Sequence, residues 1–166
     1  MGVKLKYIVE ELNFEIIHKS TDYDEIEIKN SDINRPGLQL CGYYSKFVKD
    51  RIQLIGTQEW HYINSLNDEE KFSTLEKLFK YNIPVVVFSR NNMIFPQAKF
   101  LAEKYNVTII RSHDTTSKIF SKIISLVDEA LAPTTRMHGV LLDISGIGVL
   151  ITGRRRAEND SHEIRW

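Results

Sequence analysis

Short apolar runs alternate along most of this chain with longer segments in which apolar residues return every three or four positions. The clearest run is Ile-Pro-Val-Val-Val-Phe at 83–88, which is apolar throughout, as strands buried on both faces of a parallel sheet are. The clearest helical stripe consists of Ile119, Phe120, Ile123, Ile124 and Val127. The same patterns predict strands at 14–18, 26–28, 52–56, 83–88 and 107–110, helices at 3–12, 57–63, 68–79, 96–105 and 115–127, and a short helix with a loop within 38–48.

The order of these elements predicts the fold class. Strands that alternate with helices of this length are typical of βαβ units, whose strands run parallel. We therefore expect an α/β domain with a parallel or mostly parallel sheet flanked by helices. This first domain should end near Ala132-Pro133, directly after the long helix, and so cover residues 1–132.

Beyond Pro133 the pattern changes to two apolar runs, 140–144 and 147–151, separated by Ser145-Gly146. A two-residue turn between two such runs predicts a β-hairpin. A hairpin by itself cannot bury its own apolar face. We therefore interpret residues 133–153 as the first edge of a second domain.

Charge and composition narrow the classes of partner. The 22 basic residues balance the 22 acidic ones, so no basic field favours a nucleic acid. No apolar run reaches the roughly 18–20 residues that span a bilayer, so no membrane partner is expected. The single cysteine, Cys41, excludes an intrachain disulfide and suits a reducing cytoplasm, and its apolar neighbours predict that it is buried.

The second apolar run leads into Gly153, where a phosphate-binding P-loop could begin. A P-loop has the pattern G-x-x-x-x-G-K-[ST], in which backbone N–H groups and the lysine hold phosphates and the hydroxyl binds Mg²⁺. Counting from Gly153, the chain has Glu158, Asn159 and Asp160 at the positions of the second glycine, the lysine and the hydroxyl. The sequence therefore has the start of a P-loop without its functional residues.

Three segments together resemble one family, in its order and spacing. They are Thr-Thr-Arg-Met-His-Gly-Val-Leu-Leu-Asp with the following run to Gly153, Asn-Arg-Pro-Gly-Leu-Gln-Leu-Cys-Gly-Tyr at 34–43, and Arg-Ile-Gln-Leu-Ile-Gly at 51–56. The chain is similar in these motifs to bacterial HPr kinase/phosphorylase. The resemblance covers about residues 1–153, and the tail at 154–166 does not share it.

The resemblance implies an activity for the full-length family. Such an enzyme phosphorylates a serine of the phosphocarrier protein HPr with ATP or pyrophosphate and Mg²⁺, and removes that phosphate by phosphorolysis in carbon catabolite regulation. It implies an oligomer, and an N-terminal domain similar to that of Mur ligases. By this resemblance His138 matches a histidine near the bound phosphates, and Gly153 matches the first P-loop glycine.

On this interpretation residues 1–132 are the regulatory or assembly domain, and residues 133–153 are the first hairpin of a truncated P-loop kinase domain. Without the P-loop we expect the chain alone to bind no cofactor and to be inactive. The alternative is a stand-alone module that binds a small ligand or a partner protein. Residues 89–92, which follow a predicted strand, are a candidate small-molecule site for that alternative. The histidines lack metal-ligand spacing, so no metal site is expected.

Overall fold

The computed structural model describes the backbone of residues 2–133, 137–144 and 147–154, and the side chains of residues 2–133. The chain divides into two compact units, residues 1–131 and 132–166. Each unit is described by itself.

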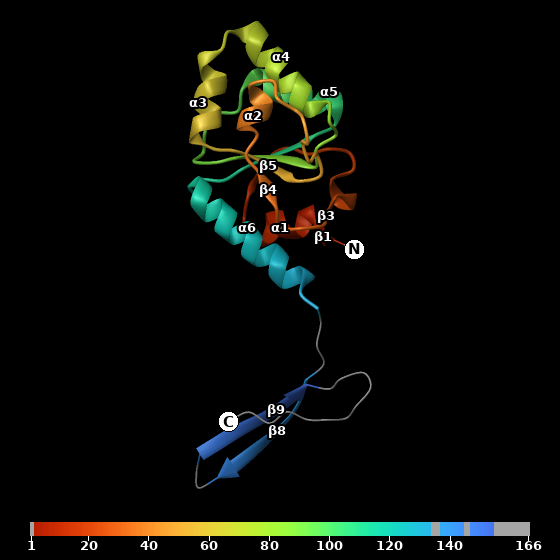
Figure 1. Ribbon diagram of the computed structural model, residues 1–166, viewed down its shortest axis with the longest axis vertical. Coiled ribbons are helices and arrows are strands. Elements are labelled where there is room, and N and C mark those ends of the chain that lie inside the picture. The colour runs from red at the N-terminus through yellow and green to blue at the C-terminus, as the bar shows by residue number, and fades with distance from the viewer. Residues whose placement is uncertain (1, 134–136, 145–146, 155–166) are drawn as a thin grey trace. The chain divides into compact units, whose positions relative to one another are not determined.

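A five-stranded sheet forms the middle of the first unit (Figure 1), with strand order β2-β7-β6-β5-β4. Its strands are β2 (Glu15–His18), β4 (Ile33–Asn34), β5 (Ile52–Ile55), β6 (Val85–Phe88) and β7 (Thr108–Arg111). Strands β4 to β7 run parallel, and β2 pairs antiparallel with β7 at one edge. The predicted α/β class with a mostly parallel sheet is therefore confirmed. A separate antiparallel pair is made by β1 (Val3–Lys4) and β3 (Glu27–Ile28).

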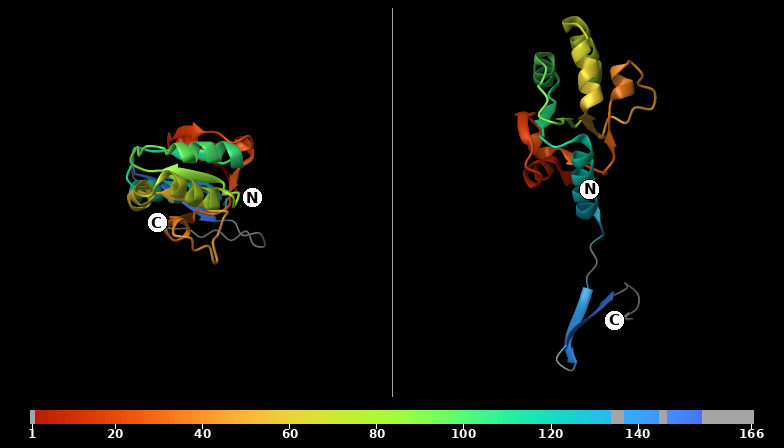
Figure 2. Two further views of the ribbon diagram at one scale, coloured as in Figure 1. Left: turned by 90° about the horizontal axis from the view of Figure 1, so that it is seen from above. Right: turned by 90° about the vertical axis from the view of Figure 1, so that its left-hand side faces the viewer.

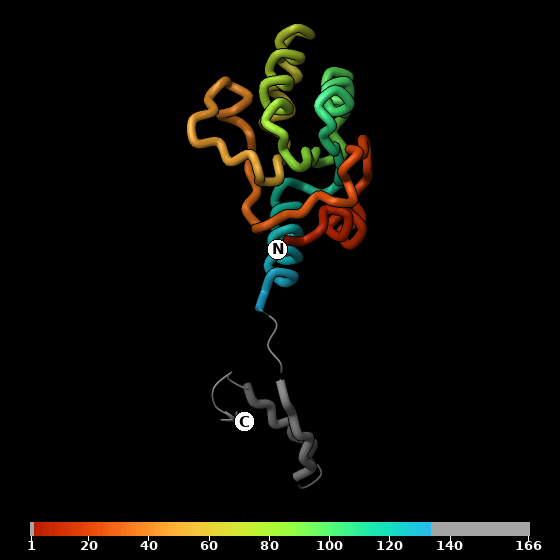
Figure 3. Tube along the Cα trace, turned by 90° about the vertical axis from the view of Figure 1, so that its right-hand side faces the viewer, coloured from red at the N-terminus to blue at the C-terminus, as the bar shows by residue number. Residues whose placement is uncertain are grey.

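Helices cover both faces of this sheet. Figure 2 shows the two helical layers of the first unit on opposite sides of the strands, and Figure 3 shows α1 and α6, red and blue-green, on the same side. One face carries α2 (Gly37–Leu40), α3 (Thr57–Ser65), α4 (Asp68–Phe79) and α5 (Pro96–Tyr105). The other face carries α1 (Leu5–Glu11) and α6 (Thr116–Leu131), with the short 3₁₀ turn η1 (Tyr23–Glu25). No helix among the described residues is both long and apolar enough to cross a membrane.

Two hydrophobic cores lie on the two faces of the sheet. Val86 and Phe88 belong to the core beneath α4 and α5, whereas Val85 and Val87 belong to the core beneath α1 and α6. Successive side chains of a strand point to opposite faces. Because both faces of β6 are covered, every position in it is apolar, which explains the continuous run in the sequence.

The ends of the helices follow local sequence signals. At the start of α4 the Asn67 side chain accepts a hydrogen bond from the Glu70 N–H at 2.8 Å, and the Glu70 carboxylate accepts one from the Asn67 N–H at 3.3 Å. Helix α5 starts at Pro96 and ends before Asn106, which has a left-handed φ of 59°. In α3, Thr57 is the first helical residue and Gly56 precedes it as the N-cap.

Two sequence-based predictions about burial are wrong. Cys41 is exposed, because α2 ends at Leu40 and the chain turns through Gly42 at a φ of 98°. Leu40, one residue earlier, is the side chain that enters the core. Ile124 is also exposed, since it is rotated by about 100° from the buried Ile123 around the helix axis.

The second unit contains two strands in its described part, β8 (Met137–Ile144) and β9 (Ile147–Arg154). They pair antiparallel, and the register places His138 opposite Gly153 and Leu142 opposite Val149.

Candidate functional site

The carboxyl ends of the four parallel strands meet at one edge of the sheet. In open α/β sheets this edge is the usual location of ligand sites. The residues that follow the strands here include Arg35 after β4, Gly56 after β5, Ser89 after β6 and Ser112 after β7. Of the sequence-based candidates, only residues 89–92 lie at this edge.

An ion pair between Arg35 and Glu59 is the main charged feature of this edge. The Arg35 Nε and Nη2 donate to the two carboxylate oxygens of Glu59 at 2.8 and 2.9 Å. The Glu59 side chain is only 5% exposed, whereas that of Arg35 is 40% exposed. The Gly56 N–H also donates to Glu59, at 3.4 Å. This bidentate geometry satisfies the buried carboxylate, which therefore serves as an anchor for Arg35 rather than as a free base.

Gly56 is required here because two side chains approach its backbone closely. A Cβ at this position would lie 2.8 Å from Thr116 Oγ1 and 2.9 Å from Arg35 Nη2. The Thr116 hydroxyl donates to Ser89 Oγ at 3.3 Å, and the fully buried Ser89 donates to the Ile55 carbonyl at 3.4 Å. Arg35, Gly56 and Ser89, which follow β4, β5 and β6, thus come together near Thr116 at the start of α6.

The turn after β6 has an unusual backbone. Arg90 and Asn91 both have left-handed φ values, 54° and 51°. Such values in residues other than glycine are strained and concentrate at functional sites. Here, however, the N–H groups of Arg90 and Asn91 donate to the carbonyls of Asp114 and Ser112. These two amides are therefore already used within the protein and are not available to an anion.

Asp114 closes this edge beside α6. Its carboxylate binds the ammonium of Lys122, and the His113 ring lies 3.6 Å away. The hydrogen bond from Lys122 is the largest influence and lowers the pKa of Asp114, although burial opposes it. The Asp114 side chain is thus held as an anion at the start of the long helix.

The two site residues predicted by resemblance lie in the second unit. His138 is on β8 and Gly153 is on β9, and the strand register makes them direct cross-strand neighbours. Positions 158–160, where the P-loop pattern is lost, fall outside the described residues. Within residues 2–133, whose side chains are described, no three potential metal ligands come together.

A cavity of about 400 Å³ lies elsewhere on the first unit, lined by Tyr44, Lys77, Lys80 and Tyr81. Tyr44 comes from the loop after α2, and the other three come from the end of α4 and the residues after it. Sequence reasoning missed this cavity, because 37 positions of chain separate the two tyrosines and no periodicity connects them. The only local sequence signal for the cavity is the pair Lys77 and Lys80, which lie three residues apart just before Tyr81.

Comparison with known proteins identifies the family. The sequence model described as HPr Serine kinase N terminus matches residues 3–127. The chain belongs to this family. The HPr kinase/phosphorylase of Clostridium tetani is 40% identical over 153 residues, which are 92% of this chain and 50% of the relative. The HPr kinase/phosphorylase of Peptoclostridium acidaminophilum is 44% identical over 154 residues, which are 92% of this chain and 49% of the relative. The chain therefore spans about half the length of the curated relatives it matches.

A solved structure shares the fold at much lower sequence similarity. It contains the CBS and DRTGG domains of the regulatory region of Clostridium perfringens pyrophosphatase, complexed with the activator diadenosine tetraphosphate. The TM-score is 0.54 at 13% identity, and the match covers 75% of this chain and 47% of the solved chain. At this identity the comparison supports the fold alone.

Proposed function

We propose that this chain is the N-terminal regulatory or assembly part of a bifunctional HPr kinase/phosphorylase. The whole enzyme would phosphorylate a serine of HPr with ATP or pyrophosphate, and would dephosphorylate it by phosphorolysis. The supporting observation is the identity of about 40% over 92% of the chain with relatives of that name. HPr as the partner, a homo-oligomer and a cytoplasmic location follow from the same proposal.

The proposal assigns a domain to each part of the chain. Residues 1–132 form the α/β domain, which we propose is similar to the N-terminal domain of Mur ligases. Residues 133–153 form the first hairpin of the P-loop kinase domain, and residues 154–166 are unrelated to the family. The register that sets His138 opposite Gly153 supports the hairpin assignment, because it brings the two proposed phosphate-site positions together.

In that full-length context each site residue has a distinct role. Gly153 would open the backbone turn around the phosphates of ATP or pyrophosphate, which bind with Mg²⁺. His138 would orient the transferred phosphoryl group or its nucleophile, since an imidazole titrates near neutral pH. The chain with Glu158, Asn159 and Asp160 lacks the lysine and hydroxyl that this chemistry needs.

A chimera tests the proposed function. Residues 1–153 are joined at Gly153 to the remaining C-terminal part of the Clostridium tetani relative, and HPr phosphorylation is measured with ATP and Mg²⁺. We expect the chimera to phosphorylate HPr and the 166-residue chain to show only background. Phosphorylation by the 166-residue chain, or an inactive but folded chimera beside an active relative, would contradict the proposal.

A matched pair of variants assigns the role of the histidine in the same chimera. His138→Ala should reduce kcat by about 100-fold or more, as expected for loss of a group that acts on the reacting phosphate. The control is His61→Gln, at an exposed position of α3 in the first unit, which should leave kcat within about twofold. Equal effects of the two changes would remove His138 from the proposed site.

A further inference from the structure

The cavity beside the end of α4 has a built aromatic wall. The rings of Tyr44 and Tyr81 stack at a centroid distance of 4.7 Å and an interplanar angle of 10°. Phe47 stands edge-on to both, at 5.5 Å from Tyr44 and 5.2 Å from Tyr81. Tyr44 and Phe47 also pack against the core beneath α4. The wall is therefore preorganised, while Tyr81 remains 39% exposed.

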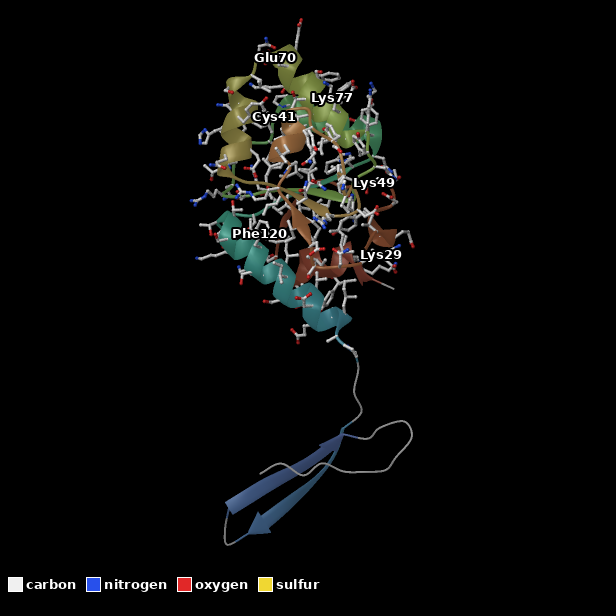
Figure 4. All side chains as sticks on the ribbon, in the orientation of Figure 1. Lys29, Cys41, Lys49, Glu70, Lys77 and Phe120 are labelled. Carbon is white, nitrogen blue, oxygen red and sulfur yellow. The ribbon has the colours of Figure 1, made fainter. Side chains whose placement is uncertain are left out.

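The rest of the cavity lining is cationic. Lys77 and Lys80 line it, and Lys77 has no ion pair among the described residues. Lys80 lies 3.7 Å from Glu76, but the same carboxylate accepts a hydrogen bond from Lys104 at 3.3 Å. One carboxylate thus serves two lysines, which leaves positive charge in excess. Figure 4 shows Lys77 on α4 and Lys49, from the loop that carries the aromatic wall, on the same flank of the first unit in that view.

The Glu76 carboxylate is held as an anion by its neighbours. The hydrogen bond from the Tyr105 hydroxyl, at 3.0 Å, is the largest influence and lowers the pKa of Glu76, with Lys104 and Lys80 adding to it against the effect of burial. The single negative charge of Glu76 is therefore shared between the ammonium groups of Lys80 and Lys104.

The Tyr44 hydroxyl is a buried donor without an acceptor. It has no hydrogen-bond partner among the described residues. Burial, and then the neighbouring Tyr81, raise the pKa of Tyr44 to about 12, so the hydroxyl keeps its proton. Buried polar groups are nearly always paired, so this hydroxyl is an unsatisfied donor within the aromatic wall.

We propose that this cavity binds a small organic anion that carries a flat aromatic ring. The ring would stack against the tyrosine wall, and the anionic group would contact the ammonium groups of Lys77 and Lys80. The volume of about 400 Å³ lies within the range of ligand pockets, roughly 300–1,000 Å³. This site belongs to the α/β domain and does not depend on the proposed kinase chemistry.

The alternative to ligand binding is that the aromatic wall has only a structural role. The aromatic wall could serve only to anchor the loop 41–51 against α4, as many surface clusters do. In that case the lysines would be ordinary solvated cations. The two roles differ in one observable, which is whether a ring and an anion on the same molecule bind better than either alone.

A titration of the 166-residue chain with three probes measures this difference. Phenyl phosphate carries both groups, inorganic phosphate carries only the anion, and benzyl alcohol carries only the ring. Binding is followed by the chemical shifts of the tyrosine ring protons. We expect phenyl phosphate to bind at least about fivefold more tightly than either other probe, and added salt to weaken it. Equal affinity for all three, or shifts that do not involve Tyr44 and Tyr81, would overturn the proposal.

Variants locate the site. Lys77→Gln should weaken phenyl phosphate binding by about three- to tenfold, while Lys99→Gln, at an exposed lysine of α5 outside the lining, should leave it within about twofold. Equal loss in the two lysine variants would identify simple charge attraction and contradict a site at this cavity.

Discussion

At the scale of single residues, Arg35 connects two elements at the carboxyl edge of the sheet, because it follows β4 and binds Glu59 on α3. Arg35 belongs to the sequence motif at 34–43, and in the structure its side chain binds the buried Glu59 and lies close to Gly56. Nothing in the local pattern could predict this, because Glu59 lies 24 positions away on another element. Pairings of this kind depend on how the strands are ordered in the sheet.

The close approach to Gly56 gives a direct test. Gly56→Ala should lower the free energy of unfolding by about 1–3 kcal/mol, since its Cβ would overlap Thr116 and Arg35. Urea unfolding followed by circular dichroism measures the loss. The control is Gly37→Ala, where an added Cβ meets nothing within 4 Å, and the expected change is within about 0.5 kcal/mol. Similar losses in both variants would mean that the close contact is relieved without cost.

Asp114 makes stability depend on pH in the acid range. Its pKa is lowered in the folded chain, first by the hydrogen bond from Lys122, so the stabilisation is present above the unfolded pKa of about 3.9. It is lost as the pH falls through the lower folded pKa. We expect the difference in unfolding midpoint between the wild type and Asp114→Asn to be constant above about pH 5 and to disappear at lower pH.

The control for this prediction is a carboxylate on α6, the helix that begins two residues after Asp114. Asp128 is an exposed carboxylate of α6, and Asp128→Asn should leave the pH dependence of the midpoint unchanged. A difference between the wild type and Asp114→Asn that is the same at all pH values would assign the effect to packing instead of ionisation.

At the scale of elements, periodicity and caps predicted most of the first unit. The buried strands were visible as apolar runs because both faces of the sheet are covered. The predicted starts of α4 and α5, at 68 and 96, agree with the structure. The conformation of the loop after α2 was the main feature that the sequence pattern did not predict. Its order comes from ring stacking between Tyr44 and Tyr81, a contact between distant segments that no local pattern encodes.

The cap of α4 provides a prediction at this scale. Asn67→Ala removes the acceptor for the Glu70 N–H and should lower the free energy of unfolding by about 1 kcal/mol. Ser73→Ala, at an exposed position within the same helix, should change it by no more than about 0.5 kcal/mol. Thermal unfolding of the two variants side by side measures the difference, and an unchanged Asn67→Ala would show that solvent replaces the cap fully.

At the scale of the whole molecule, the two hydrophobic cores described for residues 2–133 lie on the two faces of the sheet of the first unit. The family motifs, by contrast, continue to Gly153 and predicted the proposed kinase hairpin. The sequence resemblance therefore leads to the proposal of a larger enzyme. The first unit, by contrast, is defined by the contacts within residues 1–131. Neither the periodicity of the sequence nor its family motifs predicted the cavity, because its lining comes from a loop and from the end of a helix.

This arrangement predicts that the first unit folds alone. A fragment of residues 1–133 should unfold cooperatively in urea, with a midpoint close to that of the matching transition in the 166-residue chain. The reason is that residues 1–131 form a compact unit in which helices of the same unit cover both faces of the sheet. A fragment that lacks a cooperative transition would show that the remaining residues are needed for its stability.

The antiparallel pairing of β2 with β7 has a consequence for synthesis of the chain. The Glu15 carboxylate and its partner Arg111 are 96 positions apart, although their strands are neighbours. At translation rates of about 5–20 residues per second, β2 leaves the ribosome roughly 5–20 s before its partner exists. During that interval the strand is an unpaired edge, and its polar Glu15 and His18 then protect the nascent chain against pairing with other nascent chains.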